Sequence, residues 1–153
     1  MSVNKLYFAQ HGLAIDKTDN PERPLSTAGI EQTEAIARHL QRSAIPISQI
    51  FHSGKLRALQ TAEIIASVCN IKSVSAIDYL SPDADVTLIA ENLTFNNALY
   101  IGHLPHLEKL ITYLVTSRQN EAIIKFHNSG IACLEYENKH YHLKWYVSPD
   151  ELS

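Results

Sequence analysis

Two histidines follow short apolar stretches of the chain, in positions where side chains often carry out chemistry. His11 comes directly after "KLYFAQ" and precedes a glycine, and His103 comes directly after "ALYIG". An imidazole nitrogen can act as a nucleophile, or as a general acid or base near neutral pH. A histidine at the end of a buried strand therefore predicts the floor of an active site, with the following loop as its rim.

Cations in a third segment would complete a site for a phosphoryl group. Lys55 and Arg57 lie in "HSGKLRALQT", between a predicted strand and a predicted helix. A guanidinium can bind two phosphoryl oxygens at once. The first turn of a helix after His103 would add unpaired backbone N–H groups and the positive end of a helix dipole. We therefore expect His11, Arg57 and His103 to surround a phosphoryl group, with Lys55 near them.

Strand and helix signals alternate along the chain and supply the elements that position these residues. Short apolar runs predict strands at 5–10, 48–53, 74–78 and 98–103. Apolar residues at helical spacing predict a helix from Ser26 that carries Ile30, Ala37, Leu40 and Ala44, and further helices over 56–69, over 81–93 and around Leu107–Val115. Residues 130–147 predict a β-hairpin with its turn at Glu137, Asn138 and Lys139.

This alternation predicts one α/β domain over residues 1–153: a three-layer α/β/α sandwich with a mostly parallel central sheet and a C-terminal hairpin. Ligands of such sheets bind beyond the carboxyl ends of the strands. The segments "AQHG", "HSGKLRALQT" and "IGHLPH" all follow predicted strands. They should therefore meet at one edge of the sheet.

The composition narrows the classes of function. The formal net charge is −3 and there is no run of 18 apolar residues, so neither a nucleic-acid partner nor a membrane is expected. Cys69 and Cys133 are far apart in apolar surroundings, which favours buried free thiols and a cytoplasmic location. His106 follows His103 by three residues, but without a third clear ligand we expect no metal and no cofactor.

Other polar residues have simpler interpretations. Asp83 and Asp85 lie where a general acid could stand, but capping of the next helix is favoured. His140 and His142 alternate along the hairpin and are expected on an exposed face, and Thr61 is expected to cap or support its helix. Arg57 could instead form a surface ion pair with Glu63 or another acid.

Four motifs together resemble the histidine phosphatase superfamily, the phosphoglycerate mutase-like group, and within it the small SixA-type phosphohistidine phosphatases. "QHG" stands where the family has an arginine–histidine–glycine signature. "RPLSTAG", "SGKLRALQTAEII" and "GHLPHL" resemble its following motifs. The resemblance covers nearly the whole chain and implies the phosphoglycerate mutase-like fold.

The resemblance also implies a role for each matching residue. His11 would accept the phosphoryl group, and Arg57 and His103 would hold its oxygens. Arg23, in "RPL", would lie near the pocket, although an ion pair with Asp19 or Glu22 is an equal alternative. The reaction would pass through a phospho-His11 intermediate, with no metal and no cofactor.

Gln10 departs from the family pattern, because the signature arginine would stand there. An amide can donate a hydrogen bond but carries no charge, and a hydrogen bond to a charged group contributes about 1.5–3 kcal/mol. We expect about tenfold weaker phosphate binding, and loss of one donor can lower a rate by about 10²–10³. Lys55 and Arg23 are expected to compensate in part.

The sequence is compatible with three functions. The first is a phosphohistidine phosphatase that acts on a signalling or carrier protein. The second is a phosphohistidine-binding or phosphate-binding protein whose catalysis Gln10 has weakened, and the third is a phosphatase for a small phosphorylated metabolite. The first is favoured because residues 71–98 have room for only one short helix. A site without a lid suits a phosphorylated side chain on another protein.

Overall fold

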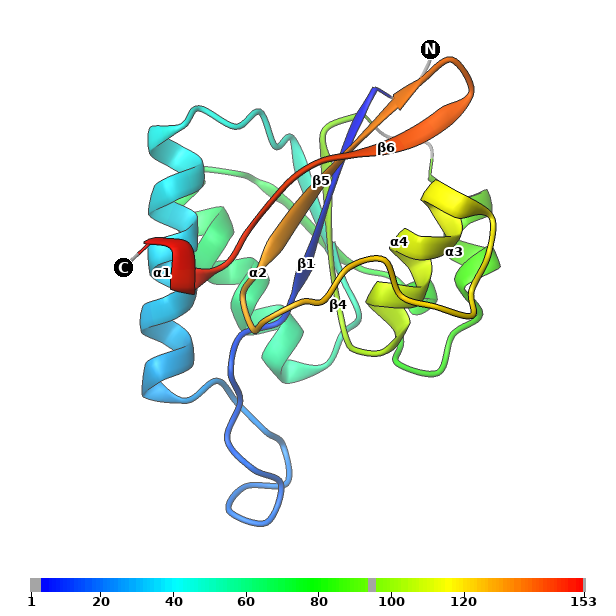
Figure 1. The fold of residues 1–153 in the computed structure, drawn as a ribbon. Helices are drawn as coiled ribbons and strands as arrows, with labels where there is room; N and C mark the ends of the chain where they lie inside the picture. The colour runs from blue at the N-terminus through cyan, green and yellow to red at the C-terminus, as the bar shows by residue number, and fades with distance from the viewer. Residues whose placement is uncertain (1–3, 94–95, 153) are drawn as a thin grey trace.

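Six strands form one sheet in the computed structural model, which describes residues 4–93 and 96–152 (Figure 1). The strand order is β3-β2-β4-β1-β5-β6. The first four strands in this order pair in parallel, whereas β5 pairs antiparallel with both β1 and β6. The strands are β1 (Lys5–Gln10), β2 (Gln49–His52), β3 (Ser73–Ala76), β4 (Ala98–Gly102), β5 (Ile131–Glu137) and β6 (His140–Val147).

Helices cover both faces of the sheet, which confirms the predicted three-layer α/β/α arrangement (Figure 1). One face packs against α1 and α2, and the other packs against α3 and α4. The helices are α1 (Thr27–Arg42), α2 (Leu56–Cys69), α3 (Val86–Glu91) and α4 (His106–Thr116), with short 3-10 helices η1 (Asp78–Leu80) and η2 (Pro149–Leu152). The single domain predicted for 1–153 stays a prediction, and residues 1–3, 94–95 and 153 lie outside the described part.

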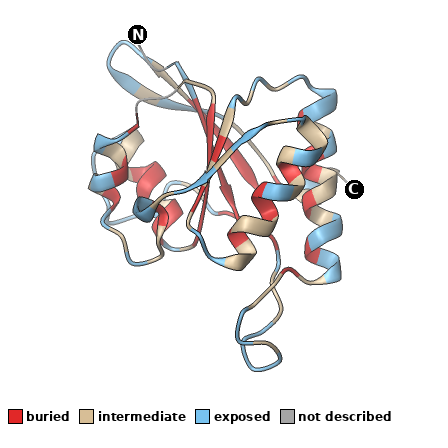
Figure 2. Cartoon of the chain, turned by 180° about the vertical axis from the view of Figure 1, so that it is seen from behind, coloured by how far each residue is buried: buried red, intermediate tan, exposed pale blue. Residues whose placement is uncertain are grey.

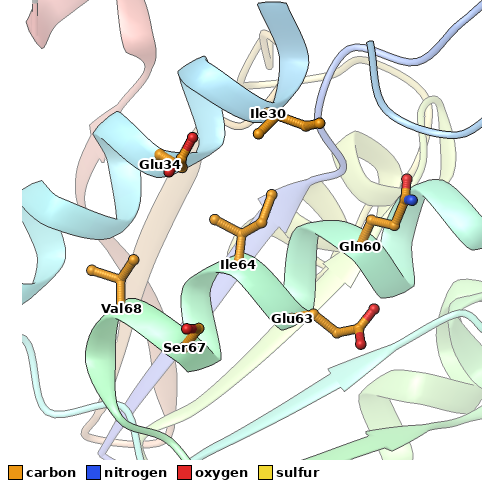
Figure 3. A pocket seen from close by; sticks show the side chains of 7 residues that line it. All are labelled: Ile30, Glu34, Gln60, Glu63, Ile64, Ser67 and Val68. Carbon is orange, nitrogen blue, oxygen red and sulfur yellow. The ribbon is translucent and has the colours of Figure 1, made fainter. Parts of the chain in front are cut away.

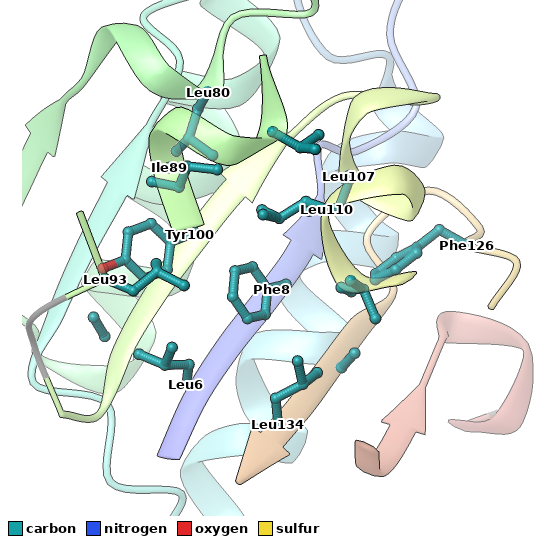
Figure 4. Close-up of a cluster of buried hydrophobic side chains, with 14 residues drawn as sticks. Leu6, Phe8, Leu80, Ile89, Leu93, Tyr100, Leu107, Leu110, Phe126 and Leu134 are labelled. Carbon is teal, nitrogen blue, oxygen red and sulfur yellow. The ribbon is translucent and has the colours of Figure 1, made fainter. Parts of the chain in front are cut away.

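The central strand β1 is buried on both faces, which explains why its sequence is a continuous apolar run rather than an alternating one. Leu6 and Phe8 belong to the core beneath α3 and α4 (Figure 4). Tyr7 and Ala9 belong to the core beneath α1 and α2. The buried strands accordingly form the middle layer, with the exposed residues of the helices outside it (Figure 2). Buried strands on both sides of β1 give its carboxyl end a rigid position.

The first two helices follow the predicted pattern with one correction. Ser26 caps α1, since its hydroxyl accepts a hydrogen bond from the Gly29 N–H at 3.0 Å. Ala44 was predicted inside this helix, but it lies beyond the end with φ 53. Ile30, one of the apolar residues whose spacing predicts this helix, is 40% exposed. The bounds predicted for α2 are confirmed.

The third helix begins later than predicted. Residues 78–80 form η1, and α3 starts at Val86 rather than near Ser81. Asp85 is its N-cap and accepts from the Thr87 N–H at 2.9 Å, which confirms the capping interpretation for this aspartate. The preceding strand, predicted over 74–78, runs from Ser73 to Ala76.

The C-terminal hairpin is confirmed. Asn138 and Lys139 form the turn with φ 53 and 68, and a two-residue hairpin turn of this kind requires a positive φ at both positions. Glu137, predicted in the turn, is the last residue of β5. His140 and His142 are exposed, as predicted.

Two further sequence-based expectations concern the cysteines and the membrane. Cys69 and Cys133 are both free, and Cys133 is buried as predicted whereas Cys69 is only half-buried. Among the residues that the structure describes, no helix is long and apolar enough to cross a membrane.

Candidate active site

The register of β1 against β4 brings the two histidines together. Gln10 pairs with Gly102, so the residues that follow them, His11 and His103, leave the sheet side by side. The His11 N–H donates to the Gly102 carbonyl at 3.1 Å. The two imidazole ring centroids lie 4.9 Å apart, with the ring planes inclined by 51°. A small anion can therefore contact both rings.

His11 is held as a neutral imidazole with one nitrogen left for chemistry. Its Nδ1 lies 2.8 Å from the Gly12 carbonyl oxygen, which can only accept, so Nδ1 carries the proton. Burial lowers the pKa of His11 to about 4, although the Gly12 carbonyl acts against this shift, and the charges of Arg57 and Arg23 lower it further. At neutral pH its Nε2 therefore carries a lone pair, as a nucleophile requires.

His103 is also neutral and is oriented by a serine. Its Nε2 lies 2.6 Å from the Ser53 hydroxyl, on the loop after β2. Burial lowers the pKa of His103 to about 3, and the nearby His11, Arg57 and Lys55 lower it in the same direction. Its Nδ1 is buried and has no hydrogen-bond partner. A neutral imidazole carries one N–H group, so it can donate one hydrogen bond to an anion without being protonated to the cation.

Arg57 lies in the first turn of α2, and the charge of its guanidinium acts on both His11 and His103. Its Nε is buried without a hydrogen-bond partner. Within the described residues it forms no ion pair with Glu63. Burial lowers the pKa of Arg57, and the charge of Arg23 adds to this. Two cations held near each other, with a buried donor unpaired, are suited to bind an anion.

Arg23 and Lys55 approach the histidines from separate loops. The Arg23 Nε donates to the Ile15 carbonyl at 3.1 Å, and among described residues Arg23 does not pair with the acids beside it, Asp19 and Glu22. Lys55 is the N-cap of α2, and its charge acts on His103. The structure thus brings all the predicted cations near the two histidines. Their roles stay predictions.

Gln10 is the last residue of β1 and is only 8% exposed. Its backbone N–H donates to the Gly130 carbonyl at 3.1 Å, while its side-chain Oε1 is buried without a hydrogen-bond partner. An unpaired buried carbonyl oxygen is costly. Gln10 therefore places an unpaired amide oxygen next to His11, at the position where the resemblance implies an arginine.

Thr61 supports the loop that carries His11, whereas the sequence predicted only that it would cap or support its own helix. Its hydroxyl accepts from the Gly12 N–H at 2.8 Å and donates to the Arg57 carbonyl at 2.8 Å. A side chain at position 12 would not fit, because a Cβ there would lie 2.7 Å from the Thr33 hydroxyl. The loop is therefore tied to α2 and packed closely against α1.

Three supporting residues were not assigned from the sequence. Ser53 contacts His103. The Asn128 side-chain amide donates to the His11 carbonyl at 3.3 Å, and the Ser129 N–H lies 3.3 Å from the same oxygen. Ser53 belongs to the motif "HSGKLRALQT", so the sequence could have indicated its role. Nothing in "HNSG" at 127–130 indicates a contact with residue 11.

No metal site is found in the described part of the chain, where no cluster of three or more His, Cys, Asp or Glu side chains has ligand geometry. His106 is buried with both ring nitrogens unpartnered, and its pKa is lowered by burial.

The backbone N–H groups at the start of α4, which were expected to be free for an anion, are only partly available. The Leu107 N–H already donates to the His103 carbonyl at 2.8 Å.

These groups form a small cationic site around the neutral imidazole of His11. An incoming phosphoryl group would meet His11 Nε2 on one side and the side chains of Arg57 and His103 around its oxygens. Fixed donors that face developing negative charge lower the barrier to such a transfer. The fold and the arrangement of these groups are suited to the transfer of a phosphoryl group.

Comparison with known proteins shows which family the chain resembles. Residues 6–80 match the model of the histidine phosphatase superfamily, branch 1. The phosphohistidine phosphatase SixA of Escherichia coli is 29% identical over 97% of this chain and 96% of its own length. A solved structure of the protein histidine phosphatase SixA complexed with tungstate superposes with a TM-score of 0.86 at 27% identity, covering 97% of this chain and 99% of that one.

A shorter match is closer in sequence. An uncharacterized protein of Picosynechococcus sp. is 44% identical over 66 residues, which make up 41% of this chain and 40% of that protein. In sequence over residues 6–80, and in its phosphoglycerate mutase-like fold over nearly the whole chain, the protein is similar to the histidine phosphatase superfamily.

Proposed function

We propose that this protein is a phosphohistidine phosphatase that removes phosphate from a histidine of a signalling or carrier protein. The observation that carries the proposal is the state of His11: a neutral imidazole, with its proton on Nδ1 and with a pKa lowered to about 4 by burial. Similarity to SixA, whose solved structure contains tungstate, supports a phosphate-type ligand and a protein substrate.

The reaction would proceed in two transfers. His11 Nε2 attacks phosphorus, a new N–P bond forms, and the N–P bond to the substrate imidazole breaks. The leaving imidazole takes a proton from water. A water molecule then attacks phospho-His11, which releases inorganic phosphate and returns His11 to its starting state. In both steps Arg57 and His103 would hold the phosphoryl oxygens, with Arg23 and Lys55 adding positive charge.

The substrate class follows from the leaving group and from the surroundings of the site. No carboxylate is found beside His11 or His103 among the groups that shift their pKa values. Asp85, one of the two candidate acids, is occupied as the cap of α3. An imidazole leaves a phosphoramidate with less help than an alkoxide needs. The site therefore suits phosphohistidine better than a phosphate ester.

Gln10 supports a second candidate function, a protein that binds phosphohistidine or phosphate and turns it over slowly. Its Oε1 is buried and unpaired, and its amide adds no charge to the site. We expect Gln10 to lower the rate rather than to abolish it, because His11 and Arg57 remain in place.

The test is dephosphorylation of a protein phosphorylated on histidine by the wild type, His11→Ala, Gln10→Arg and the size-matched control Gln10→Met. We expect turnover by the wild type, none by His11→Ala, and a rate higher by about 10–10² for Gln10→Arg. A wild type that is inert while Gln10→Arg is active would favour the binding protein. Measurable turnover that is equal in His11→Ala and the wild type would rule out both.

The proposed cellular location rests on the two cysteines. We place the protein in the cytoplasm because Cys69 and Cys133 are both free thiols, which are typical of reducing compartments.

A further inference from the structure

A groove runs between α1 and α2, outside the site already described. Its volume is about 440 Å³. It is lined by Ile30, Glu34, Gln60, Glu63, Ile64, Ser67 and Val68 (Figure 3). The side chains of Ile30, Ile64 and Val68 lie between the two helices, and a glutamate stands on each helix (Figure 3). Ile30 is 40% exposed, although it lies in the first turns of a helix whose other face is buried.

The groove carries uncompensated negative charge. Its lining includes Glu34 and Glu63 but no Lys, Arg or His. Within residues 4–93 and 96–152 neither glutamate forms an ion pair. Glu63 also acts on His52, whose pKa it raises against the larger lowering effect of burial. An apolar floor between two free carboxylates is complementary to a segment that carries both apolar and cationic side chains.

The groove starts beside the phosphoryl site. Gln60 lies one helical turn after Arg57, and its Oε1 accepts from the Leu25 N–H at 2.7 Å, in the segment that carries Arg23. At a rise of about 1.5 Å per residue, the groove begins about 5 Å and ends about 17 Å from Arg57 along α2. A specific interface involves roughly 20–30 residues on each side. A protein whose phosphohistidine reaches His11 can therefore also cover this groove.

We propose that the groove between α1 and α2 docks a basic amphipathic segment of the phosphohistidine-bearing partner protein. The proposal rests on the proposed function and names how the partner is recognised. Apolar side chains of that segment would cover Ile30, Ile64 and Val68, and its Lys or Arg residues would pair with Glu34 and Glu63. Recognition would then be divided between the phosphoryl site and the groove.

Binding of a designed probe tests the groove without any assumption about catalysis. The probe is a fluorescent 18-residue leucine–lysine amphipathic helix, and a leucine–glutamate helix is its counterpart. We expect the leucine–lysine helix alone to bind. The double variant Glu34→Lys/Glu63→Lys and the variant Ile30→Asp should each weaken binding at least tenfold. Glu31→Lys/Glu91→Lys, which changes net charge equally at exposed positions outside the groove, should change it less than twofold.

Steady-state kinetics then tests whether the groove contributes to binding of the partner protein. For a histidine-phosphorylated protein, the groove variants should raise KM at least tenfold and leave kcat unchanged, while hydrolysis of free phosphohistidine should not change. An unchanged KM, or equal loss of peptide binding in the Glu31→Lys/Glu91→Lys control, would overturn the docking proposal. An inert wild type would refute the proposed function instead, and peptide binding would still test the groove. A self-associated wild type that Glu34→Lys/Glu63→Lys dissociates would assign the groove to a second copy and overturn the proposal.

Discussion

Single residues of the site gain their reactivity from burial rather than from a neighbouring acid. His11 and His103 have pKa values of about 4 and about 3, chiefly because burial disfavours their charged forms. Positive charge comes instead from arginine, which stays protonated at any pH of interest. In the proposed mechanism, the neutral imidazoles would supply the nucleophile and hydrogen-bond donors, and Arg57 and Arg23 would supply positive charge.

Arg57 allows the most direct test at this scale. Arg57→Ala removes a charged donor, worth about 1.5–3 kcal/mol in a hydrogen bond to an ion, and should weaken tungstate binding by about 10–100-fold. The measurement is isothermal titration with tungstate or phosphate. Arg38→Ala, an exposed arginine on α1, is the matched control and should bind as the wild type does. Unchanged tungstate affinity in Arg57→Ala would remove Arg57 from the site.

At the scale of elements, the site depends on contacts between the loop after β1 and the helices around it. Thr61 joins the loop at Gly12 to the start of α2. Thr61→Val should leave the Gly12 N–H buried without a partner, so we expect the free energy of unfolding to fall by about 1–3 kcal/mol. We also expect kcat to fall, since His11 would lose part of its support.

Urea unfolding and phosphohistidine turnover measure the two effects. Thr61→Ser keeps the hydroxyl and should retain most of the stability and the rate. If Thr61→Val were as stable and as active as the wild type, the hydrogen bond would not hold the loop.

The elements also show what the sequence can and cannot predict. Residues 56–69 form α2 as predicted, since apolar spacing and Asn70 in the left-handed conformation mark both its length and its end. The helix predicted from 81 begins at Val86, because Ser81, Asp83 and Asp85 are all residue types that cap helices and only the tertiary structure selects Asp85. The partners of the histidines are separated from them by 50 residues for Ser53 and by 117 for Asn128, beyond any local pattern.

For the whole molecule, burial of histidines links stability to pH. His11 and His103 have folded-state pKa values below the ordinary value of 6.5, so the unfolded chain binds more protons between pH 6.5 and about 4 for His11, or about 3 for His103. The free energy of unfolding is then greatest above pH 6.5 and falls as the pH decreases through this window. His52 and His106, whose pKa values burial also lowers, should add to the slope.

Urea unfolding at pH values from 8 to 4.5 measures this dependence. His11→Asn should flatten the curve in part. A wild-type free energy that rises as the pH falls from 6.5 would contradict the direction of these pKa shifts.

The attachment of the His11 loop has a consequence for the energetics of ligand capture. The Gly12 N–H is bonded to Thr61, and the carbonyls of Gln10 and His11 lie within reach of the Ser129 N–H. A backbone held from separate parts of the chain has little conformational entropy left to lose when a phosphoryl group arrives. The site is preorganised, so its affinity depends on charge and hydrogen bonds rather than on ordering. Restoring one charge at Gln10 should therefore strengthen binding without any accompanying rearrangement of the chain.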